Sequence, residues 1–323
     1  MSLNVLRFRH GGRPLWGVVR EGAITVIPGE FATTRAFLEA NPIETLSKLN
    51  EPTLNEGDVE LHTPVTQNQQ FLCQGANYRQ HMIESGVDPD AKTFNMIFTK
   101  APSCIAPANA DVVRPRRVRF LDYEIELGLV LKRDMTSGQQ VTDANLHEFV
   151  AGVVIVNDYS ARDIQIPELQ FYKGKSFRTF GPVGPYLCLL APDDFKKLRE
   201  LTLKLTVNGA LRQNDSFANV VHGPSETLTE LSAVHDLGIG DLLSTGTPAG
   251  CALSVPSPTR QRIAALLPVA MKWKMFERIQ ARRSQYLQLG DVVESRIATA
   301  DQSIDLGAQR NRIVGDVDSA ILA

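Results

Sequence analysis

Short apolar runs alternate with turn signals over the first part of the chain. In residues 3–28 the runs are separated by Gly11-Gly12 and Glu21-Gly22, a pattern that predicts a β-meander. Further strand-like runs follow, at residues 118–131, 151–156, 186–190, 201–207 and 241–245. The chain is therefore predicted to have a β-dominated α+β fold with interspersed helices.

A helical pattern in residues 31–50 and a polar, turn-rich stretch in residues 51–57 separate the meander from these later strands. A composition shift of this kind is typical of a domain boundary. We therefore expect a small β-rich N-terminal domain over residues 1–65 and a main domain over residues 66–323.

One segment of the main domain, residues 257–287, lacks strand alternation and is strongly basic. Pro268 is expected to divide it into two helices. A basic helical insertion of this kind could guard a site for anionic substrates, cover a subunit interface or form a solvated surface. We favour the last two roles, because most charge runs are surface features. Its seven basic residues, against Glu277 alone, are Arg260, Arg262, Lys272, Lys274, Arg278, Arg282 and Arg283.

The overall composition argues against several classes of partner. The 323 residues include 43% hydrophobic and 22% charged positions, with a formal net charge of −2, so we expect no nucleic-acid partner. The N-terminus lacks the apolar core of a signal peptide, and no apolar run reaches the length of a membrane span. The four cysteines form no CxxC pair, which favours a reducing compartment. We expect a cytoplasmic protein that does not bind membranes.

Three carboxylates share one face of the predicted strand at residues 121–131. Asp122, Glu124 and Glu126 alternate with apolar residues, and their mutual repulsion requires compensation by a cation or by solvent. A hard divalent cation with oxygen ligands would supply it. A solvent-facing edge strand explains this segment equally well.

The next apolar run, residues 151–156, ends abruptly at Asn157-Asp158. If the chain turns helical there, Asp158, Arg162 and Gln165 lie on one helix face. The acid could then ligate a metal while the guanidinium and the amide face a polarised oxygen. The alternative is an N-capping aspartate with an i,i+4 ion pair.

Upstream, Asn77, His81 and Glu84 have the same spacing. A carboxylate one turn from an imidazole can orient a general base, although such pairs are also common on surfaces. Two glycine-rich stretches follow, one around Lys175 and one at residues 245–250. The first would let an ammonium approach a ligand, and the second offers backbone N–H groups to a carboxylate.

Taken together, these segments resemble the fumarylacetoacetate hydrolase family. The resemblance is dense over residues 70–250, resumes at residues 289–294 and extends weakly to the N-terminal meander. It rests on the ordered motifs Asn-Tyr-x-x-His-x-x-Glu (77–84), Asp-Tyr-Glu-x-Glu-Leu (122–127), Asn-Asp-x-Ser-Ala-Arg-Asp-x-Gln (157–165), Gly-Lys-Ser-Phe (174–177), Gly-Pro-x-Gly-Pro (181–185), Val-Asn-Gly (207–209) and Gly-Thr-Pro-Ala-Gly (246–250).

The resemblance implies a mixed β-sandwich roll as the catalytic domain, a homodimer, and Mg²⁺ or Mn²⁺ as cofactor, with Ca²⁺ as a substitute in crystals. It assigns the metal to Glu124, Glu126 and Asp158. The other implied roles are a water-activating dyad on a mobile lid helix (His81 and Glu84), oxyanion and substrate-orienting groups (Arg162, Gln165 and Lys175), and substrate contacts (Tyr78, Gly246 and Thr247).

The activity implied is hydrolysis of a C–C bond in a small 2-oxo or 1,3-dicarbonyl acid, such as an acylpyruvate, in aromatic or related catabolism. Decarboxylation, isomerisation or tautomerisation, and hydration remain alternatives, because each uses the same metal-assisted chemistry next to a keto group. From other classes we consider a non-catalytic ligand-binding protein with this fold, and a binder of anionic surfaces acting through residues 257–287. That segment is longer than the usual family connection.

Overall fold

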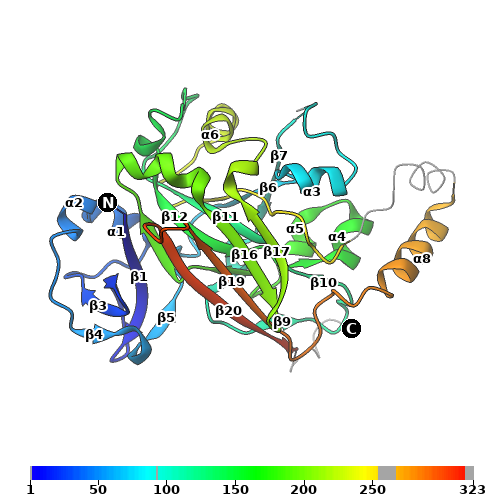
Figure 1. The fold of residues 1–323 in the computed structure, drawn as a ribbon, viewed down its shortest axis with the longest axis horizontal. Helices are drawn as coiled ribbons and strands as arrows, with labels where there is room; N and C mark the ends of the chain where they lie inside the picture. The colour runs from blue at the N-terminus through cyan, green and yellow to red at the C-terminus, as the bar shows by residue number, and fades with distance from the viewer. Residues whose placement is uncertain (1, 92–93, 254–266, 317–323) are drawn as a thin grey trace.

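The computed structural model describes residues 2–91, 94–253 and 267–316 of the chain (Figure 1). The strands of its large sheet are β1 (Leu3–His10), β2 (Arg13–Arg20), β3 (Ala23–Val26), β4 (Leu54–Asn55), β5 (Glu60–His62), β6 (Phe71–Gly75), β7 (Met96–Lys100), β8 (Ile105–Pro107), β11 (Ile125–Leu131), β12 (Val150–Asn157), β14 (Gly181–Val183), β15 (Tyr186–Leu189) and β18 (Leu242–Ser244). A five-stranded sheet contains β9 (Val112–Arg114), β16 (Thr202–Val207), β17 (Ala210–Ser216), β19 (Val292–Ala298) and β20 (Asp305–Gly315).

A short two-stranded ladder pairs β10 (Leu121–Asp122) with β13 (Ser160–Ala161). The described α-helices are α1 (Thr34–Ala40), α2 (Ile43–Leu46), α3 (Arg79–Glu84), α4 (Arg162–Glu168), α5 (Phe171–Lys175), α6 (Pro224–Ser232) and α8 (Val269–Gln280). The 3-10 helices are η1 (Glu56–Asp58), η2 (Pro102–Cys104), η3 (Leu146–Glu148), η4 (Pro192–Glu200) and η5 (Phe217–Asn219).

The N-terminal meander forms as predicted, from β1 to β3. The helical prediction for residues 31–50 is correct only in part, because the segment forms two short helices on either side of Pro42. Proline lacks the N–H that continues a helix, so α2 starts afresh after it. The meander also joins the main body, since β1 pairs antiparallel with β15. The domain division at residue 65 stays a prediction.

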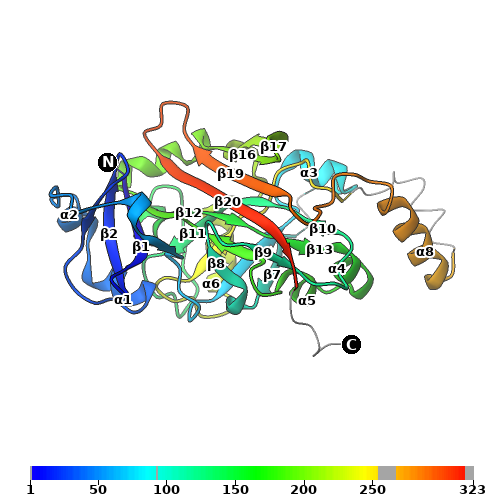
Figure 2. The ribbon, with the colours of Figure 1, turned by 90° about the horizontal axis from the view of Figure 1, so that it is seen from below.

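The two larger sheets pack face to face, with β16, β19 and β20 lying across β11 and β12 (Figures 1 and 2). Leu127 and Ile155 from the large sheet share one buried cluster with Leu205 and Ile297 from the five-stranded sheet. Side chains that alternate along each strand therefore fill the space between the layers. The predicted β-dominated α+β fold, a mixed β-sandwich roll, is confirmed.

Strand β11 lies in the centre of the large sheet, between β12 and β18. All seven of its residues are buried, so the solvent-facing edge strand considered for residues 121–131 is wrong. The predicted strand 118–131 is also interrupted, because β10 ends at Asp122 and β11 begins at Ile125. The candidate carboxylates therefore lie inside the protein.

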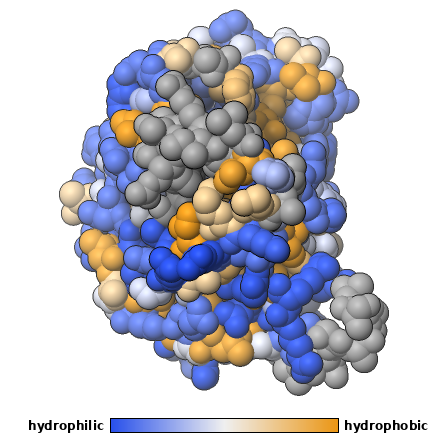
Figure 3. Space-filling model, turned by 90° about the vertical axis from the view of Figure 1, so that its right-hand side faces the viewer, coloured by the Kyte–Doolittle hydropathy of each residue, from blue (hydrophilic) through white to orange (hydrophobic). Residues whose placement is uncertain are grey.

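Helix α8 follows Pro268, where the second helix of the basic segment was predicted. The first predicted helix falls largely on residues 254–266, outside the described residues. Helix α8 projects from the body (Figures 1 and 2) and contacts it through Phe276, whose ring packs edge-on against Phe120. On the face of the molecule that carries α8, hydrophilic residues adjoin several apolar ones (Figure 3).

No described helix has both the length and the apolar character to cross a membrane.

Candidate metal centre and active site

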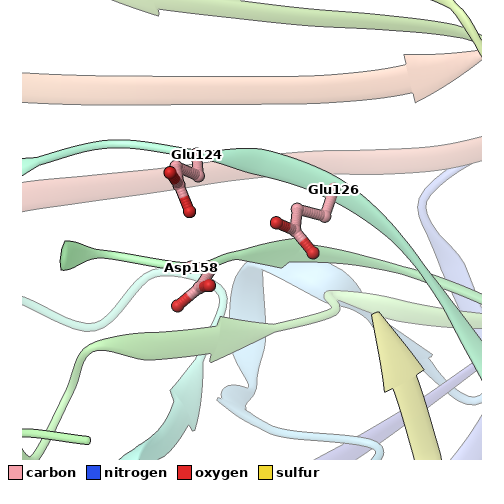
Figure 4. Close-up of side chains that lie close together, drawn as sticks. All are labelled: Glu124, Glu126 and Asp158. Atoms are coloured by element: carbon pink, nitrogen blue, oxygen red, sulfur yellow. The ribbon is translucent and has the colours of Figure 1, made fainter. Parts of the chain in front are cut away.

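Three buried carboxylates meet at one point between β11 and β12. Glu124 immediately precedes β11, Glu126 lies within it, and Asp158 follows the last residue of β12. The backbone N–H of Asp158 donates to the carbonyl of Glu124 at 2.8 Å, which fixes the two segments side by side. One oxygen from each carboxylate lies within 4.8 Å of the others, and the side chains point toward one another (Figure 4).

Two buried lysines pair with these carboxylates. Lys175, the last residue of α5, places Nζ 2.5 Å from Glu124, 2.6 Å from Asp158 and 2.8 Å from the Ser160 hydroxyl. Lys100, at the end of β7, donates to Asp158 at 2.5 Å and to the carbonyl of Phe180 at 2.8 Å. Both oxygens of Asp158 are thus bonded to ammonium groups.

A buried arginine, Arg162, pairs with Asp122 and Glu124. It opens α4 and forms ion pairs with Asp122, at 2.8 Å, and with Glu124. Its Nη1 donates to Oε1 of Gln165 at 2.8 Å, so Arg162 and Gln165 share the predicted helix face. Asp158 does not belong to that helix, which begins four residues later, and it pairs with lysines instead of Arg162. The proposed i,i+7 face starting at Asp158 and the N-capping alternative are therefore both wrong.

The two glutamates have opposite electrostatic environments. Burial raises the pKa of Glu126 to about 8, and the nearby charges of Asp158 and Glu124 act in the same direction. Burial also acts to raise the pKa of Glu124, but the positive charges of Arg162 and Lys175 outweigh it and hold that pKa well below its usual range. Glu126 is the carboxylate that lacks an adequate positive partner.

The residues present fit a divalent cation. Four buried carboxylates (Asp122, Glu124, Glu126 and Asp158) face three buried cations (Lys100, Arg162 and Lys175). Glu126 accepts hydrogen bonds only from uncharged donors among the described residues, the Ser244 hydroxyl at 2.5 Å and the Gly246 N–H at 3.1 Å. Hard cations such as Mg²⁺ prefer an all-oxygen donor set of this kind.

The loop at residues 245–250, which follows β18, contacts the segment that carries the carboxylates. Gly246 has a φ of +86°, and a Cβ there would lie 2.8 Å from Cβ of Asn77, so no other residue fits without displacement. The Thr247 hydroxyl donates to the carbonyl of Ile125 and accepts from Gln213, both at 2.9 Å. Gly246 and Thr247 thus brace β11, and the substrate contacts assigned to them stay predictions.

Helix α3 forms the other side of the site. It begins at Arg79, so Asn77 precedes it and instead bonds the carbonyls of Thr245 and His222. Burial lowers the pKa of His81, while the charge of Glu124 acts to raise it and that of Arg162 to lower it. Glu84 is exposed and accepts from Gln80 at 3.3 Å, not from His81.

Tyr78, directly before α3, is fully buried. Its hydroxyl has no hydrogen-bond partner among the described residues. Burial raises its pKa well above the usual value, and the charge of Glu126 is the second cause in the same direction. The hydroxyl therefore stays protonated. A buried donor without an acceptor is costly, and a ligand oxygen would satisfy it.

Sequence reasoning missed Lys100 and the support given by Ser244. Lys100 follows the short strand-like run Met96–Thr99, directly before Ala101-Pro102, and a single lysine in that position was a usable signal. Ser244 gave no such signal in the sequence, because serine is an ordinary residue at a strand end.

A sequence model of the family described as fumarylacetoacetate (FAA) hydrolase, C-terminal, matches residues 70–314. The chain belongs to the fumarylacetoacetate hydrolase family. It is 35% identical over 196 residues to oxaloacetate tautomerase YisK of Bacillus subtilis, a match that covers 60% of this chain and 63% of the tautomerase. It therefore matches a little under two thirds of that relative's length.

One further relative of the chain and one solved structure extend the comparison. The fumarylacetoacetate hydrolase domain-containing protein 2 homolog of Dictyostelium discoideum is 28% identical over 231 residues, covering 67% of this chain and 74% of that protein. The solved structure of a fumarylacetoacetate hydrolase from Exiguobacterium antarcticum superposes with a TM-score of 0.73 at 27% identity, covering 97% of this chain and all of that one. The likeness in fold thus extends over nearly the whole sequence, including the part before residue 70.

Proposed function

We propose that this protein is a divalent-metal-dependent enzyme that catalyses proton transfer at the carbon next to the keto group of a small 2-oxo acid, that is, keto–enol tautomerisation. The observation that carries the proposal is the buried Glu124, Glu126 and Asp158 group, with His81 near enough for its imidazole to feel the charge of Glu124. The similarity to an oxaloacetate tautomerase supports the same reaction class.

Glu124, Glu126 and Asp158 would hold the cation. When bound, a divalent cation polarises the oxygens of a 2-oxo acid and acidifies the neighbouring carbon. His81 is suited to move the proton, because burial lowers its pKa and keeps the imidazole neutral near pH 7. A neutral imidazole can accept a proton from carbon and return it to oxygen.

The lysines and Arg162 are suited to a different task. The carboxylates around Lys175 raise its pKa despite its burial, so it stays protonated and cannot act as a base. A fixed ammonium and a fixed guanidinium instead stabilise negative charge that develops on the substrate oxygens. We assign the Tyr78 hydroxyl, the Gln165 amide and the 245–250 loop to substrate positioning.

The second candidate is hydrolysis of a C–C bond in an acylpyruvate-like acid. The specific observation in its favour is that His81 and Glu84 lie one turn apart on α3, as a water-activating pair requires. Glu84 would have to leave Gln80 and bond His81 when substrate binds. Hydrogen bonds in ligand-free catalytic sites commonly tighten in this way.

The test follows the enol of oxaloacetate by ultraviolet absorbance, with Mg²⁺ and with EDTA, while CO₂ release is monitored. Pyruvate release from an acylpyruvate is measured in parallel. Accelerated, EDTA-sensitive ketonisation without CO₂ supports tautomerisation. Pyruvate release that exceeds ketonisation in rate supports the hydrolase, and CO₂ release supports a decarboxylase. The absence of all three in metal-loaded protein overturns the assignment to 2-oxo acids.

A further inference from the structure

Gln213 is a buried polar side chain in the layer between the two larger sheets. It lies on β17 (Figure 1), where it pairs with Leu205 of β16, and only 1% of its surface is exposed. Leu205 belongs to the apolar cluster that fills this layer. A polar side chain in such a layer is costly unless its hydrogen bonds are made, so the partners of Gln213 indicate what it does there.

The side-chain amide of Gln213 bonds two segments of the candidate metal centre. Its Oε1 accepts from the N–H of Ile125 at 3.0 Å, and Ile125 is the residue between the two glutamates of the carboxylate group. Its Nε2 donates to the Thr247 hydroxyl at 2.9 Å and to the carbonyl of Pro248 at 2.8 Å. One amide thus connects β17 to the start of β11 and to the loop after β18.

These bonds act where strand pairing ends. β18 pairs with β11 only from Gly128 to Val130, so Ile125 lies beyond the paired stretch. The N–H of Ile125 is taken by Gln213, and its carbonyl is taken by the Thr247 hydroxyl. Side chains therefore hold the part of β11 that carries the glutamates, where β18 does not reach it.

A shift in strand register directly precedes Gln213. Between β16 and β17 the pairing shifts so that Arg212 is an extra residue in β17, and a β-bulge of this kind changes the direction in which side chains point. The carbonyl of Arg212 lies against Gly250, where a Cβ would be 2.1 Å from its oxygen. Only glycine lets β17 approach the loop after β18 this closely, so the position of Gln213 is built into the backbone.

We propose that Gln213 is a positioning residue, which fixes the two glutamates of the carboxylate group and so tunes the affinity of the site for a divalent cation. This inference rests on the proposed function. Gln213 acts through the N–H of Ile125 and through the loop after β18, whose Gly246 N–H donates to Glu126 at 3.1 Å. Groups that orient metal ligands typically change the metal affinity by roughly 10–100-fold when they are removed.

The chain offers a matched control in Gln309. It lies on β20, in the same five-stranded sheet, and its exposed fraction is also 1%. Its Nε2 donates to the carbonyls of Ile155, Pro182 and Gly184, at 2.9, 3.1 and 2.9 Å. Both glutamines therefore link the same two layers. None of the three carbonyls adjoins a residue of the carboxylate group, so a change at Gln309 tests the effect of losing such a link alone.

The experiment uses the full chain as wild type, Gln213→Met, Gln213→Asn and Gln309→Met. Calorimetry measures the affinity for Mg²⁺, the Tm in EDTA reports stability, and oxaloacetate ketonisation is titrated with Mg²⁺. We expect Gln213→Met to bind Mg²⁺ roughly tenfold or more weakly, and to need correspondingly more Mg²⁺ for half-maximal ketonisation. Both methionine variants should lower the Tm, because each loses buried hydrogen bonds. Gln309→Met should keep the wild-type affinity for Mg²⁺.

The outcomes separate this inference from the proposed function. An unchanged affinity for Mg²⁺ in Gln213→Met, or an equal loss in Gln309→Met, overturns the positioning role. If Gln213→Met does not fold, Gln213→Asn decides, because it keeps an amide but withdraws it by one methylene. This variant should also weaken Mg²⁺ binding, and wild-type affinity in it overturns the role. If wild type binds Mg²⁺ but acts on no 2-oxo acid, the proposed function fails, while the Mg²⁺ affinities still decide the role of Gln213.

Discussion

The two sides of the candidate site are built differently. On the β11 side, Glu124 and Glu126 are buried in a central strand region and tied into ion pairs and hydrogen bonds. On the opposite side, α3 has six residues, and its outer positions, including Glu84, are exposed. The β11 side holds charged groups in fixed positions, whereas α3 can move without unfolding the core.

Catalysis and stability are expected to be coupled on the β11 side and separable on α3. Removing one charge from the β11 side leaves its partners buried and unpaired, which is costly. A change on α3 removes few contacts, so it can alter the reaction while the fold stays intact. Each variant below tests whether that division of roles holds.

The largest effect is expected for Glu124→Ala. This change leaves the buried Arg162 and Lys175 without one of their partners, so we expect a loss of about 3–5 kcal/mol in the free energy of unfolding and no measurable activity. Urea denaturation checks the stability. The control is Glu277→Ala, which removes a 2.5 Å pair with Arg119 on the surface and should cost only about 0–1 kcal/mol. Similar losses in both variants would contradict the proposed contrast.

The next largest effect is expected for His81→Asn. Loss of a general base typically lowers kcat by roughly 10²–10⁴-fold, whereas the unfolding free energy and the Mg²⁺-induced rise in Tm should stay near wild type. Because the pKa of His81 is lowered from 6.5, wild-type activity should fall only as the pH drops below that value. A pH profile whose acid limb lies above 6.5 would remove His81 from the role of base.

A smaller effect concerns Glu126 and pH. Its pKa is about 8 in the folded, metal-free protein, against an ordinary value of 4.5. Between these values the folded state holds a proton that the unfolded state lacks, so this group's contribution to stability falls as the pH rises. A divalent cation requires the ionised form, so the Mg²⁺-induced rise in Tm should grow over the same window.

Thermal unfolding at the two ends of this window, with Mg²⁺ and with EDTA, checks the prediction. Glu126→Gln should remove this part of the pH dependence and most of the response to Mg²⁺. Asp193→Asn, at an exposed ion pair far from the site in sequence, serves as the control. A Mg²⁺ response that is independent of pH in wild type would contradict the assignment of Glu126.

The metal group was predictable because its signals are local. Alternation places Asp122, Glu124 and Glu126 on one face of a segment, Asp158 marks the abrupt end of a buried run, and the resemblance to the family selects Glu124, Glu126 and Asp158 from these four. Neither inference needs knowledge of how distant segments pack. The meander and the central strands were predictable for the same reason.

The partners of these carboxylates were not predictable in this way. Lys100 donates to Asp158, which lies 58 residues away in sequence, and the N–H of Ala252 donates to Asp122, which lies 130 residues away. The guanidinium of Arg162, the first residue of α4, likewise forms an ion pair with Asp122 of β10 and not with Asp158. The homodimer stays a prediction, because it depends on a surface that a single chain does not define.

The smallest effect is expected for Glu84→Gln, and it distinguishes the two candidate reactions. Glu84 is exposed and bonded to Gln80, so a tautomerase that relies on His81 alone should lose no more than about tenfold in kcat. A hydrolase that needs the His81–Glu84 pair to activate water should lose nearly as much activity as His81→Asn. Measuring ketonisation and acylpyruvate cleavage in both variants makes the comparison internal. A loss in cleavage alone would mean that hydrolysis depends on Glu84, whereas ketonisation needs only His81 from α3, and that α3 can change the reaction while the β11 side keeps the fold intact.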